Sequence, residues 1–316
     1  MRKTTAVASV IGMSALALVG CSSAAVTPES CGRVANTSPT LLSAFEVSDQ
    51  VGTPPTASFP KPFVAASPEH MDVVTGSGAV IESLDQAVYF DLTLFDGVTG
   101  VAVPFTGYTD EDWRVSNLGA LIAEVPGLED AFLCASEGSR VVAALGAEGG
   151  SEALSMSAMQ ATGQLIDPAH TIAVVDINRV LPASADGSPV YNAGHGMPSV
   201  IRTPAGVPGV TVPRGAAPSE TRTQTLLKGD GDELGADEVF IGQILTVQWD
   251  TGRVVSSTWA DEALQVSPVE NLPEDVRGAV IGATAGSQVM TVVPDADHGA
   301  LVYVIDILGT SDMPAM

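Results

Sequence analysis

The feature that most constrains the fold is an internal repeat, because the same landmarks occur twice along the chain in the same order. The first copy covers residues 52–176 and the second covers 206–306. Each copy opens on a stretch punctuated by Pro and a Gly-x-Gly segment, and a turn that combines Asp with Gly follows. A Gly-Ser pair followed by an apolar run comes next, and an apolar run containing one Asp comes last. Self-similarity of this kind predicts two related domains, and 316 residues are enough for each to bury its own core.

The two copies differ in length between the Gly-Ser pair and the last apolar run. The first copy carries a segment there, at about 146–168, that is rich in Ser, Ala and Met, and the second copy has lost most of it. Met156 and Met159 in this segment either line an adaptable apolar surface or pack, as loop residues, on their own domain. The missing segment of the second copy therefore bears on function.

Short apolar segments separated by Gly and Pro, with only 5% aromatic residues, predict strands joined by tight turns. One short helix is expected in each copy, because apolar residues recur there at helical spacing. The expected elements, first copy and then second, are central strands at 87–95 and 239–249, helices at 127–135 and 273–281, strands at 140–145 and 288–293, and last strands at 171–180 and 300–308. This order predicts an α+β fold of two tandem modules, each an antiparallel sheet wrapped on one short helix.

The N-terminus has the pattern of a secretory signal peptide. Arg2 and Lys3 precede an apolar run that is too short to span a bilayer, and small residues lead from it to Cys21. The end of this segment resembles a bacterial lipobox, which implies cleavage before Cys21 and acylation of its thiol, as by palmitate. The alternative is an ordinary secretory signal with a chance Cys. We expect an extracytoplasmic protein that is lipid-anchored to the cell membrane.

Composition shifts along the chain predict its domain organisation. Ser, Thr and Pro dominate before the first repeat, and Gly, Ser and Pro dominate between the repeats. The linker between the repeats is expected to be exposed and moderately flexible. The expected layout is a signal peptide at 1–20, an N-terminal tether at 21–44, a first domain at 45–181, a linker at 182–197 and a second domain at 198–312.

The assignment of Cys21 to the N-terminal signal leaves two further cysteines. If Cys21 is acylated, Cys31 and Cys134 remain as a pair, and outside the cytoplasm such a pair tends to oxidise. We expect a disulfide that attaches the N-terminal segment to the first domain; two separate thiols are the alternative. The spacing contains no Cys-x-x-Cys, so it supports neither a redox motif nor a zinc site.

Charge and motifs exclude several functions. The formal net charge of −24 argues against nucleic acid as a partner and against electrostatic binding to anionic lipid. The acidic segment at 230–238 lacks the ligand pattern of an EF-hand loop, and the four histidines are scattered. No serine-hydrolase elbow, P-loop or zinc-protease motif occurs. We expect no metal and no cofactor.

The order of landmarks resembles the FKBP-type peptidyl-prolyl cis-trans isomerase family. Residues 166–172, Ile-Asp-Pro-Ala-His-Thr-Ile, are similar to the Ile-Pro-Pro-x-x-Thr-Leu segment of the family. Residues 249–259 resemble the Trp-Asp-Thr-Gly-x-x-Phe-Asp-Ser-Ser-Trp form of secreted bacterial members. The resemblance covers about 45–180 and 198–310, and it implies a lipoprotein with two tandem FKBP-like domains, the second with a shortened flap.

The resemblance also implies which residues line a groove for proline. In the first domain they are Phe90, Leu128, Ile166 and Val174. In the second domain they are Ile244, Val255, Val276, His298 and Tyr303. The Asp of the family's groove and the Trp of its floor have no counterpart in either copy. His298 stands where the family has a hydrogen-bonding Tyr, and it is either a donor or an exposed loop residue.

Prolyl isomerisation requires no covalent intermediate, only relief of a barrier of roughly 18–20 kcal/mol set by amide resonance. An apolar pocket and a donor placed for the twisted amide lower that barrier. The resemblance implies a prolyl isomerase or foldase that acts on proline-containing polypeptides of secreted or surface proteins. A catalytically inactive FKBP-like binding or chaperone lipoprotein is the alternative. A solute-binding lipoprotein is disfavoured, because the alternation of long helices and parallel strands is absent.

Overall fold

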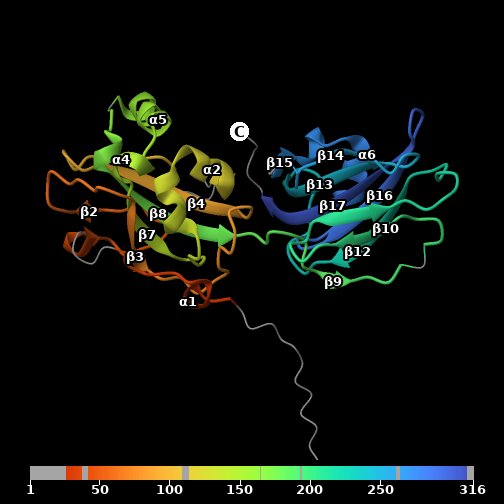
Figure 1. Cartoon of the computed structure of the whole chain (residues 1–316), viewed down its shortest axis with the longest axis horizontal. Coiled ribbons are helices and arrows are strands. Elements are labelled where there is room, and N and C mark those ends of the chain that lie inside the picture. The colour runs from red at the N-terminus through yellow and green to blue at the C-terminus, as the bar shows by residue number, and fades with distance from the viewer. Residues whose placement is uncertain are drawn as a thin grey trace, which may run out of the picture.

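The computed structural model describes residues 26–37, 42–108, 114–163, 165–192, 194–260 and 264–311. Two large antiparallel sheets, one in each half of the chain, carry short helices, so the predicted α+β fold is confirmed (Figure 1). We call each sheet with its packed elements the first and the second domain. The signal peptide and Cys21 lie outside the described residues. Within the described ranges, no helix combines the length and apolar character that a membrane crossing requires.

The first domain is built on a six-stranded sheet in the order β3-β7-β8-β4-β5, with β6 also paired to β4. Its strands are β3 Glu69–Val74, β4 Ala87–Asp96, β5 Ala102–Pro104, β6 Arg114–Asn117, β7 Arg140–Ala144 and β8 Thr171–Val180. Both faces of this sheet are covered, which explains why β4, β7 and β8 are buried almost throughout. Helices cover one face, and an N-terminal arm at 42–65 covers the other with Phe45, Phe59 and Phe63.

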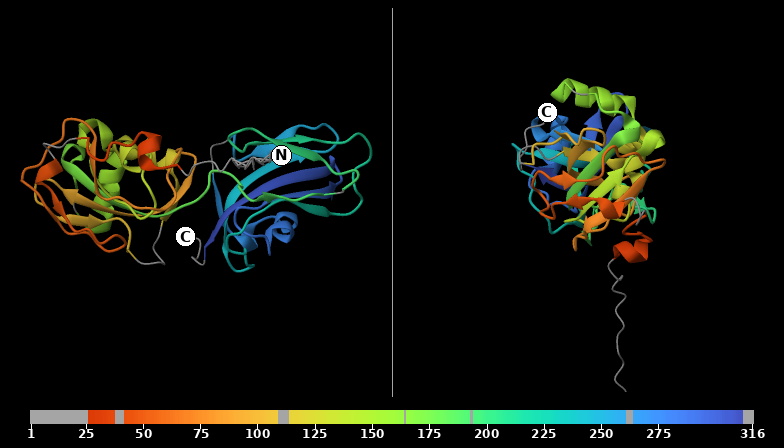
Figure 2. Two further views of the ribbon diagram at one scale, coloured as in Figure 1. Left: turned by 90° about the horizontal axis from the view of Figure 1, so that it is seen from below. Right: turned by 90° about the vertical axis from the view of Figure 1, so that its left-hand side faces the viewer.

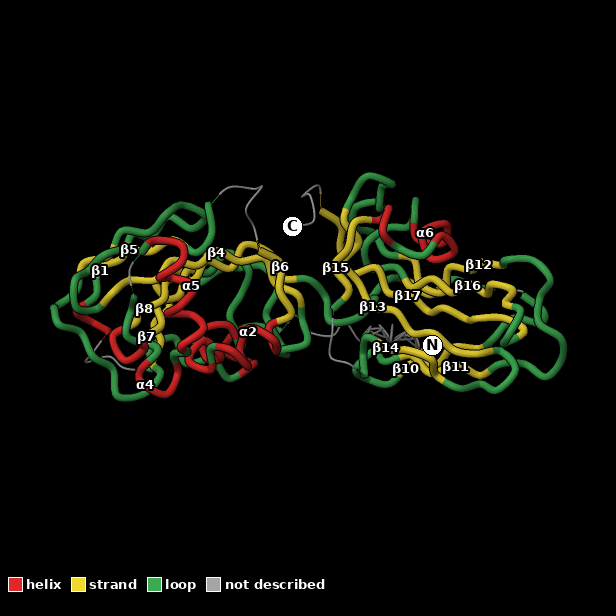
Figure 3. Tube along the Cα trace, turned by 90° about the horizontal axis from the view of Figure 1, so that it is seen from above, coloured by secondary structure: helices red, strands yellow, loops and turns green. Residues whose placement is uncertain are grey.

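Helices are more numerous in the first domain than predicted (Figure 3). They are α2 Leu118–Glu124, η2 Pro126–Leu128, α3 Glu129–Phe132, α4 Gly146–Gly149, α5 Glu152–Thr162 and η3 Pro168–His170. The single helix expected at 127–135 is wrong, because it is divided into η2 and α3. The flap expected as a loop at 146–168 contains α5, where Ser151 accepts a hydrogen bond from the backbone of Leu154 and Gly163 ends the helix in the left-handed conformation.

The second domain is built on a seven-stranded sheet in the order β14-β13-β17-β16-β12-β9, with β15 also paired to β13. Its strands are β9 Ser188–Pro189, β12 Arg222–Lys228, β13 Val239–Gln248, β14 Val254–Ser257, β15 Gln265–Pro268, β16 Gln288–Asp295 and β17 Gly299–Ser311. The helix expected at 273–281 is α6 Glu274–Val280, preceded by η4 Val269–Asn271. A separate hairpin of β10 Ser199–Arg202 and β11 Pro208–Thr211 lies against the face opposite α6.

The segment between the two sheets, predicted as an exposed and moderately flexible linker at 182–197, is hydrogen-bonded to the second sheet. Strand β9 lies within it and pairs with β12. The backbone N–H of Ala185 donates to Asp306 Oδ2 at 2.8 Å, and that of Gly187 donates to the carbonyl of Gly286 at 2.9 Å. These bonds give the linker a fixed path from the first domain to the second, as Figure 2 shows.

The N-terminal segment is attached to the first domain through a disulfide. Cys31, at the end of α1 Pro28–Cys31, is bonded to Cys134, and the two Cα atoms lie 5.6 Å apart. Arg33 forms an ion pair with Asp72 on β3 and also donates to the carbonyl of Leu133 at 2.8 Å. The ion pair holds the segment to β3, and the disulfide and the hydrogen bond to Leu133 hold it to the residues that follow α3.

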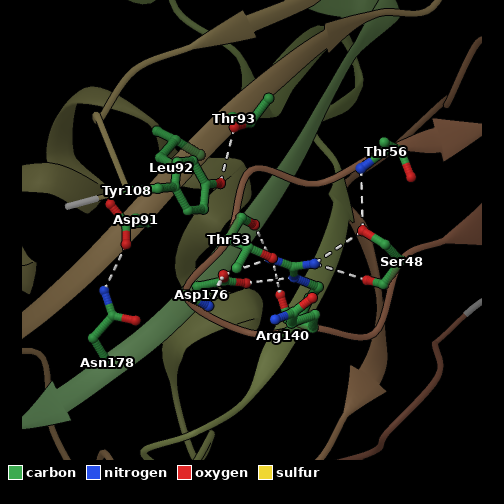
Figure 4. A network of polar contacts seen from close by, with 12 residues as sticks. Ser48, Thr53, Thr56, Asp91, Leu92, Thr93, Tyr108, Arg140, Asp176 and Asn178 are labelled. Carbon is green, nitrogen blue, oxygen red and sulfur yellow. Dashed lines mark hydrogen bonds and ion pairs between the residues drawn. The ribbon is translucent and has the colours of Figure 1, made fainter.

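A fully buried ion pair lies at the centre of the first sheet (Figure 4). Arg140 on β7 donates to both carboxylate oxygens of Asp176 on β8, each at 2.6 Å. The other guanidinium N–H groups reach the carbonyls of Ser48 at 2.8 Å and Thr53 at 2.6 Å, and the backbone of Gly52 donates to Asp176 Oδ2. The pair therefore links two strands to the N-terminal arm.

The second domain has the same arrangement without a cation. Gln288 on β16 stands where the first domain has its Arg, and its Nε2 donates to Asp306 Oδ1 on β17 at 2.7 Å. The other oxygen accepts from the backbone of Ala185. Both donors are neutral, so burial raises the pKa of Asp306 above its usual value.

We expect Asp176→Asn to lower the free energy of unfolding by about 3–5 kcal/mol, because the charge of Arg140 would remain buried without its counterion. The control is Asp232→Asn, which breaks the exposed pair with Arg179 at 3.9 Å and should cost less than about 1 kcal/mol. Urea unfolding followed by circular dichroism measures both. Equal losses in the two variants would show that the buried pair does not hold the domain together.

We expect the stability of the second domain to depend on pH through Asp306. A carboxyl whose pKa is raised on folding stabilises the folded state in full below the unfolded value of about 3.9, and this contribution is lost as pH rises through the folded pKa. The difference in Tm between the chain and Asp306→Asn should therefore move in favour of the unmodified chain as pH falls from neutral towards that value. A difference that is constant with pH would contradict the assignment.

Candidate functional site

Three of the four residues predicted to line the groove of the first domain are brought together on the helix-covered face of its sheet. Phe90 lies on β4, Leu128 ends η2 and Ile166 follows α5, and all three belong to one hydrophobic cluster. Their exposed fractions are 4%, 0% and 2%. The ring of Phe90 packs edge-on against Phe132 of α3, with centroids 5.2 Å apart. This face is a packed core rather than an open groove.

Helix α5 closes this face. Leu154 and Ala158 on α5 pack into the same cluster as the predicted groove residues. The hydroxyl of Ser155 donates to the carbonyl of Ile166 at 2.6 Å, which fixes the chain beyond the helix. Phe90 and Leu128 are also covered by α2 and α3, which contribute Ile122 and Phe132 to the same cluster. The segment that the resemblance would make a flap thus adds to the cover of this face.

The assignment of Val174 to the groove is wrong. Side chains alternate between the two faces of a strand, and on β8 it is Ala173 and Val175 that face the helices. Val174 faces the N-terminal arm, in a cluster with Phe45 and Phe95. The assignment from sequence was displaced by one residue, which moves a strand side chain to the opposite face.

In the second domain, three of the five predicted groove residues lie together. Val276 on α6 is buried, and Ile244 on β13 and Tyr303 on β17 pack against the same cluster while remaining partly exposed. Among the described residues, the hydroxyl of Tyr303 has no hydrogen-bond partner. Partial burial raises the pKa of Tyr303, so the hydroxyl keeps its proton and can donate. This face is more open than its counterpart in the first domain.

The two remaining residues lie outside that cluster. Val255 is 54% exposed on β14. His298 lies in the turn between β16 and β17, where its Nδ1 is 2.7 Å from Asp295 Oδ1. This hydrogen bond holds the pKa of Asp295 below its usual value. The nitrogen facing Asp295 is therefore engaged locally, and the structure does not bring His298 into the cluster with Tyr303.

A cavity of about 610 Å³ lies between the two domains, and nothing in the sequence pointed to it. Its lining combines residues that precede β4, residues of the linker and residues of β13 and the turn after β14. Beside it, Tyr89 and Ile241 join an apolar seam between the sheets, and burial raises the pKa of Tyr89. The polar and aromatic residues of the lining are Glu82, Ser83, Asp85, Gln86, Ser184, Asp186, Gln243, Thr258 and Trp259.

No cluster with enough His, Cys, Asp and Glu ligands for a metal ion occurs in the part of the chain that the structure describes. The acidic segment at 230–238 contributes one exposed ion pair, between Asp232 and Arg179.

No protein-family model and no curated protein matches the chain. Among solved structures, the three FKBP domains of wheat FKBP73 are similar at 11% identity and a TM-score of 0.31, with 77% of this chain and 94% of that chain covered. FkpA from Escherichia coli is similar at 11% identity and a TM-score of 0.29, covering 39% and 55%. FKBP12 from Mycobacterium tuberculosis, described as a putative prolyl isomerase, is similar at 17% identity and a TM-score of 0.26, covering 30% and 86%. The chain thus has a distant structural similarity to FKBP-type domains, including proteins with several of them.

Proposed function

We propose that the chain is an extracytoplasmic, lipid-anchored FKBP-like protein that binds exposed segments of proline-containing polypeptides, and that its first domain does not catalyse prolyl isomerisation. The observation that carries the second part is the closed face of the first domain, where Phe90, Leu128 and Ile166 are all less than 5% exposed. A catalyst must surround the X-Pro bond with apolar groups and a donor. Here the apolar groups are already in contact with one another.

Helix α5 supplies a surface for binding. Met156 and Met159 are 52% and 44% exposed, and their spacing of three places them on one side of the helix. Leu165, just beyond the helix, is 65% exposed. About half of each methionine is therefore open to solvent. Unbranched thioether side chains adapt to varied apolar partners, as a protein that receives many polypeptides requires.

The location outside the cytoplasm is supported by the disulfide between Cys31 and Cys134, since such bonds persist in oxidising compartments. The lipid anchor at Cys21 rests on the sequence pattern alone. It would keep the binding surface near the membrane, where secreted polypeptides emerge unfolded.

We expect the soluble chain, residues 22–316, to slow the aggregation of a chemically unfolded model protein. Met156→Gln combined with Met159→Gln should raise the concentration needed by about threefold or more, because it removes the apolar side of α5. Light scattering measures the aggregation. Val98→Gln, which alters a 49% exposed residue in the turn after β4, is the control and should have no effect. No suppression by the unmodified chain, or an equal effect of the control, would contradict the proposal.

Prolyl isomerisation by the second domain is a second candidate function. It is favoured by one observation, the partial exposure of Ile244 and Tyr303 beside the buried Val276. A prolyl ring could lie against these apolar groups, and the hydroxyl of Tyr303 could donate to the carbonyl of the twisted amide.

If this candidate is correct, the soluble chain accelerates cis-to-trans isomerisation of short X-Pro peptides, and Tyr303→Phe lowers kcat/KM about tenfold or more by removing the donor while keeping the ring. A protease-coupled peptide assay measures the rate. Leu165→Ser, which changes the first domain only at an exposed side chain, should leave kcat/KM unchanged. Absence of acceleration by the unmodified chain would eliminate this candidate and leave the binding function.

A further inference from the structure

We infer that the cavity between the two domains is a binding site for a cationic side chain, a guanidinium or an ammonium group, carried by a polypeptide segment. The inference rests on the proposed function in one respect, since a bound polypeptide would supply the side chain. At about 610 Å³ the cavity falls within the range of sites that hold small ligands, which form preferentially at domain interfaces.

The charge of the lining selects for a cation. Glu82 and Asp85 contribute carboxylates from the first domain, and Asp186 contributes one from the linker. In the described part of the chain, none of the three forms an ion pair, and no Lys, Arg or His lines the cavity. Carboxylates around a partly enclosed space concentrate a negative potential there, which attracts cations and repels anions.

Gln243 provides an observation independent of the carboxylates. Its side chain lines the cavity and is only 5% exposed. Its Oε1 accepts from the hydroxyl of Thr258 at 2.5 Å, and its Nε2 has no hydrogen-bond partner among the described residues. This N–H is not fully buried, so a ligand that brings an acceptor such as a peptide carbonyl can replace water there.

The equivalent position in the first domain shows what a completed network looks like. Asp91 pairs across the sheet with Asp176 as Gln243 pairs with Asp306. Asp91 accepts from the hydroxyl of Thr106 and from Asn178 Nδ2 at 2.8 Å, so both of its oxygens are satisfied (Figure 4). Gln243 accepts from a threonine hydroxyl, as Asp91 does, but no side chain bonds to it as Asn178 bonds to Asp91. The first network is closed, whereas the second ends at the cavity.

Trp259 adds the aromatic surface that a cation binds. It lies in the turn after β14 and lines the cavity beside Thr258. An indole ring attracts a guanidinium or ammonium group placed over its face. Its Nε1 is buried and, within the described ranges, without a partner. A basic residue within a peptide carries both required groups, the cation and the acceptor.

The test is the binding of a fluorescein-labelled Ala-Ala-Arg-Ala-Ala peptide to the soluble chain, residues 22–316, measured by fluorescence anisotropy. The same peptide with citrulline in place of arginine keeps the shape and loses the charge, and we expect it to bind about tenfold more weakly or worse. Unlabelled L-arginine amide, used as a competitor, distinguishes a free cation from a peptide. Competition at the same concentration as the unlabelled peptide would mean that the cation alone is recognised.

Asp85→Asn combined with Asp186→Asn removes two of the lining charges with little change in size, and should weaken the arginine peptide about tenfold or more. The control Asp49→Asn changes an exposed carboxyl that is not in the cavity and should leave affinity unchanged. Circular dichroism verifies folding of each variant. Equal binding of the arginine and citrulline peptides, or unchanged affinity in the double variant, would overturn the inference.

The outcomes separate this inference from the proposed function. Suppression of aggregation that depends on Met156 and Met159, without binding of the arginine peptide, overturns the cavity site alone. Binding of the arginine peptide that depends on Asp85 and Asp186, without suppression of aggregation, supports the site and overturns the proposed function alone.

Discussion

The buried ion pair between Arg140 and Asp176 is the interaction on which the architecture depends. Two charges removed from water are tolerated only when each is fully hydrogen-bonded, and here the backbone of the N-terminal arm completes their shells. The arm is thereby fixed across the sheet, where its phenylalanines cover the face opposite the helices. In the second domain Asp306 holds the linker through Ala185. One carboxylate on the last main strand thus attaches the preceding segment in each copy, and in the second it positions the wall of the cavity.

The two copies differ in how the helix-bearing face of the sheet is covered. The first has α5 added to its helix-covered face, where burial of Leu154 and Ala158 in the cluster stabilises the domain. The second is shorter at this point, and Ile244 and Tyr303 remain partly exposed. The apolar face is therefore covered in the first domain and partly open in the second.

The sequence predicted the elements whose signal is local and repeated. Central and last strands have bounds within three residues of those expected, because long apolar segments next to Gly turns permit few other structures. Helix α5 was missed because the resemblance suggested a flap, although Ser151 and Gly163 are ordinary helix-capping residues. Val174 was misassigned because a strand has a period of two, so an alignment displaced by one residue selects the wrong face. The cavity could not be predicted, because its lining comes from segments far apart in the chain.

The cavity is formed by both domains and the linker, so neither domain would have it alone. Its carboxylates come from the first domain and the linker, while Gln243 and Trp259 come from the second. The apolar seam of Tyr89, Leu181 and Ile241 and the path of the linker hold these groups at a fixed separation. A site assembled in this way needs no flexible loop to close, since its polar groups are oriented before a ligand arrives.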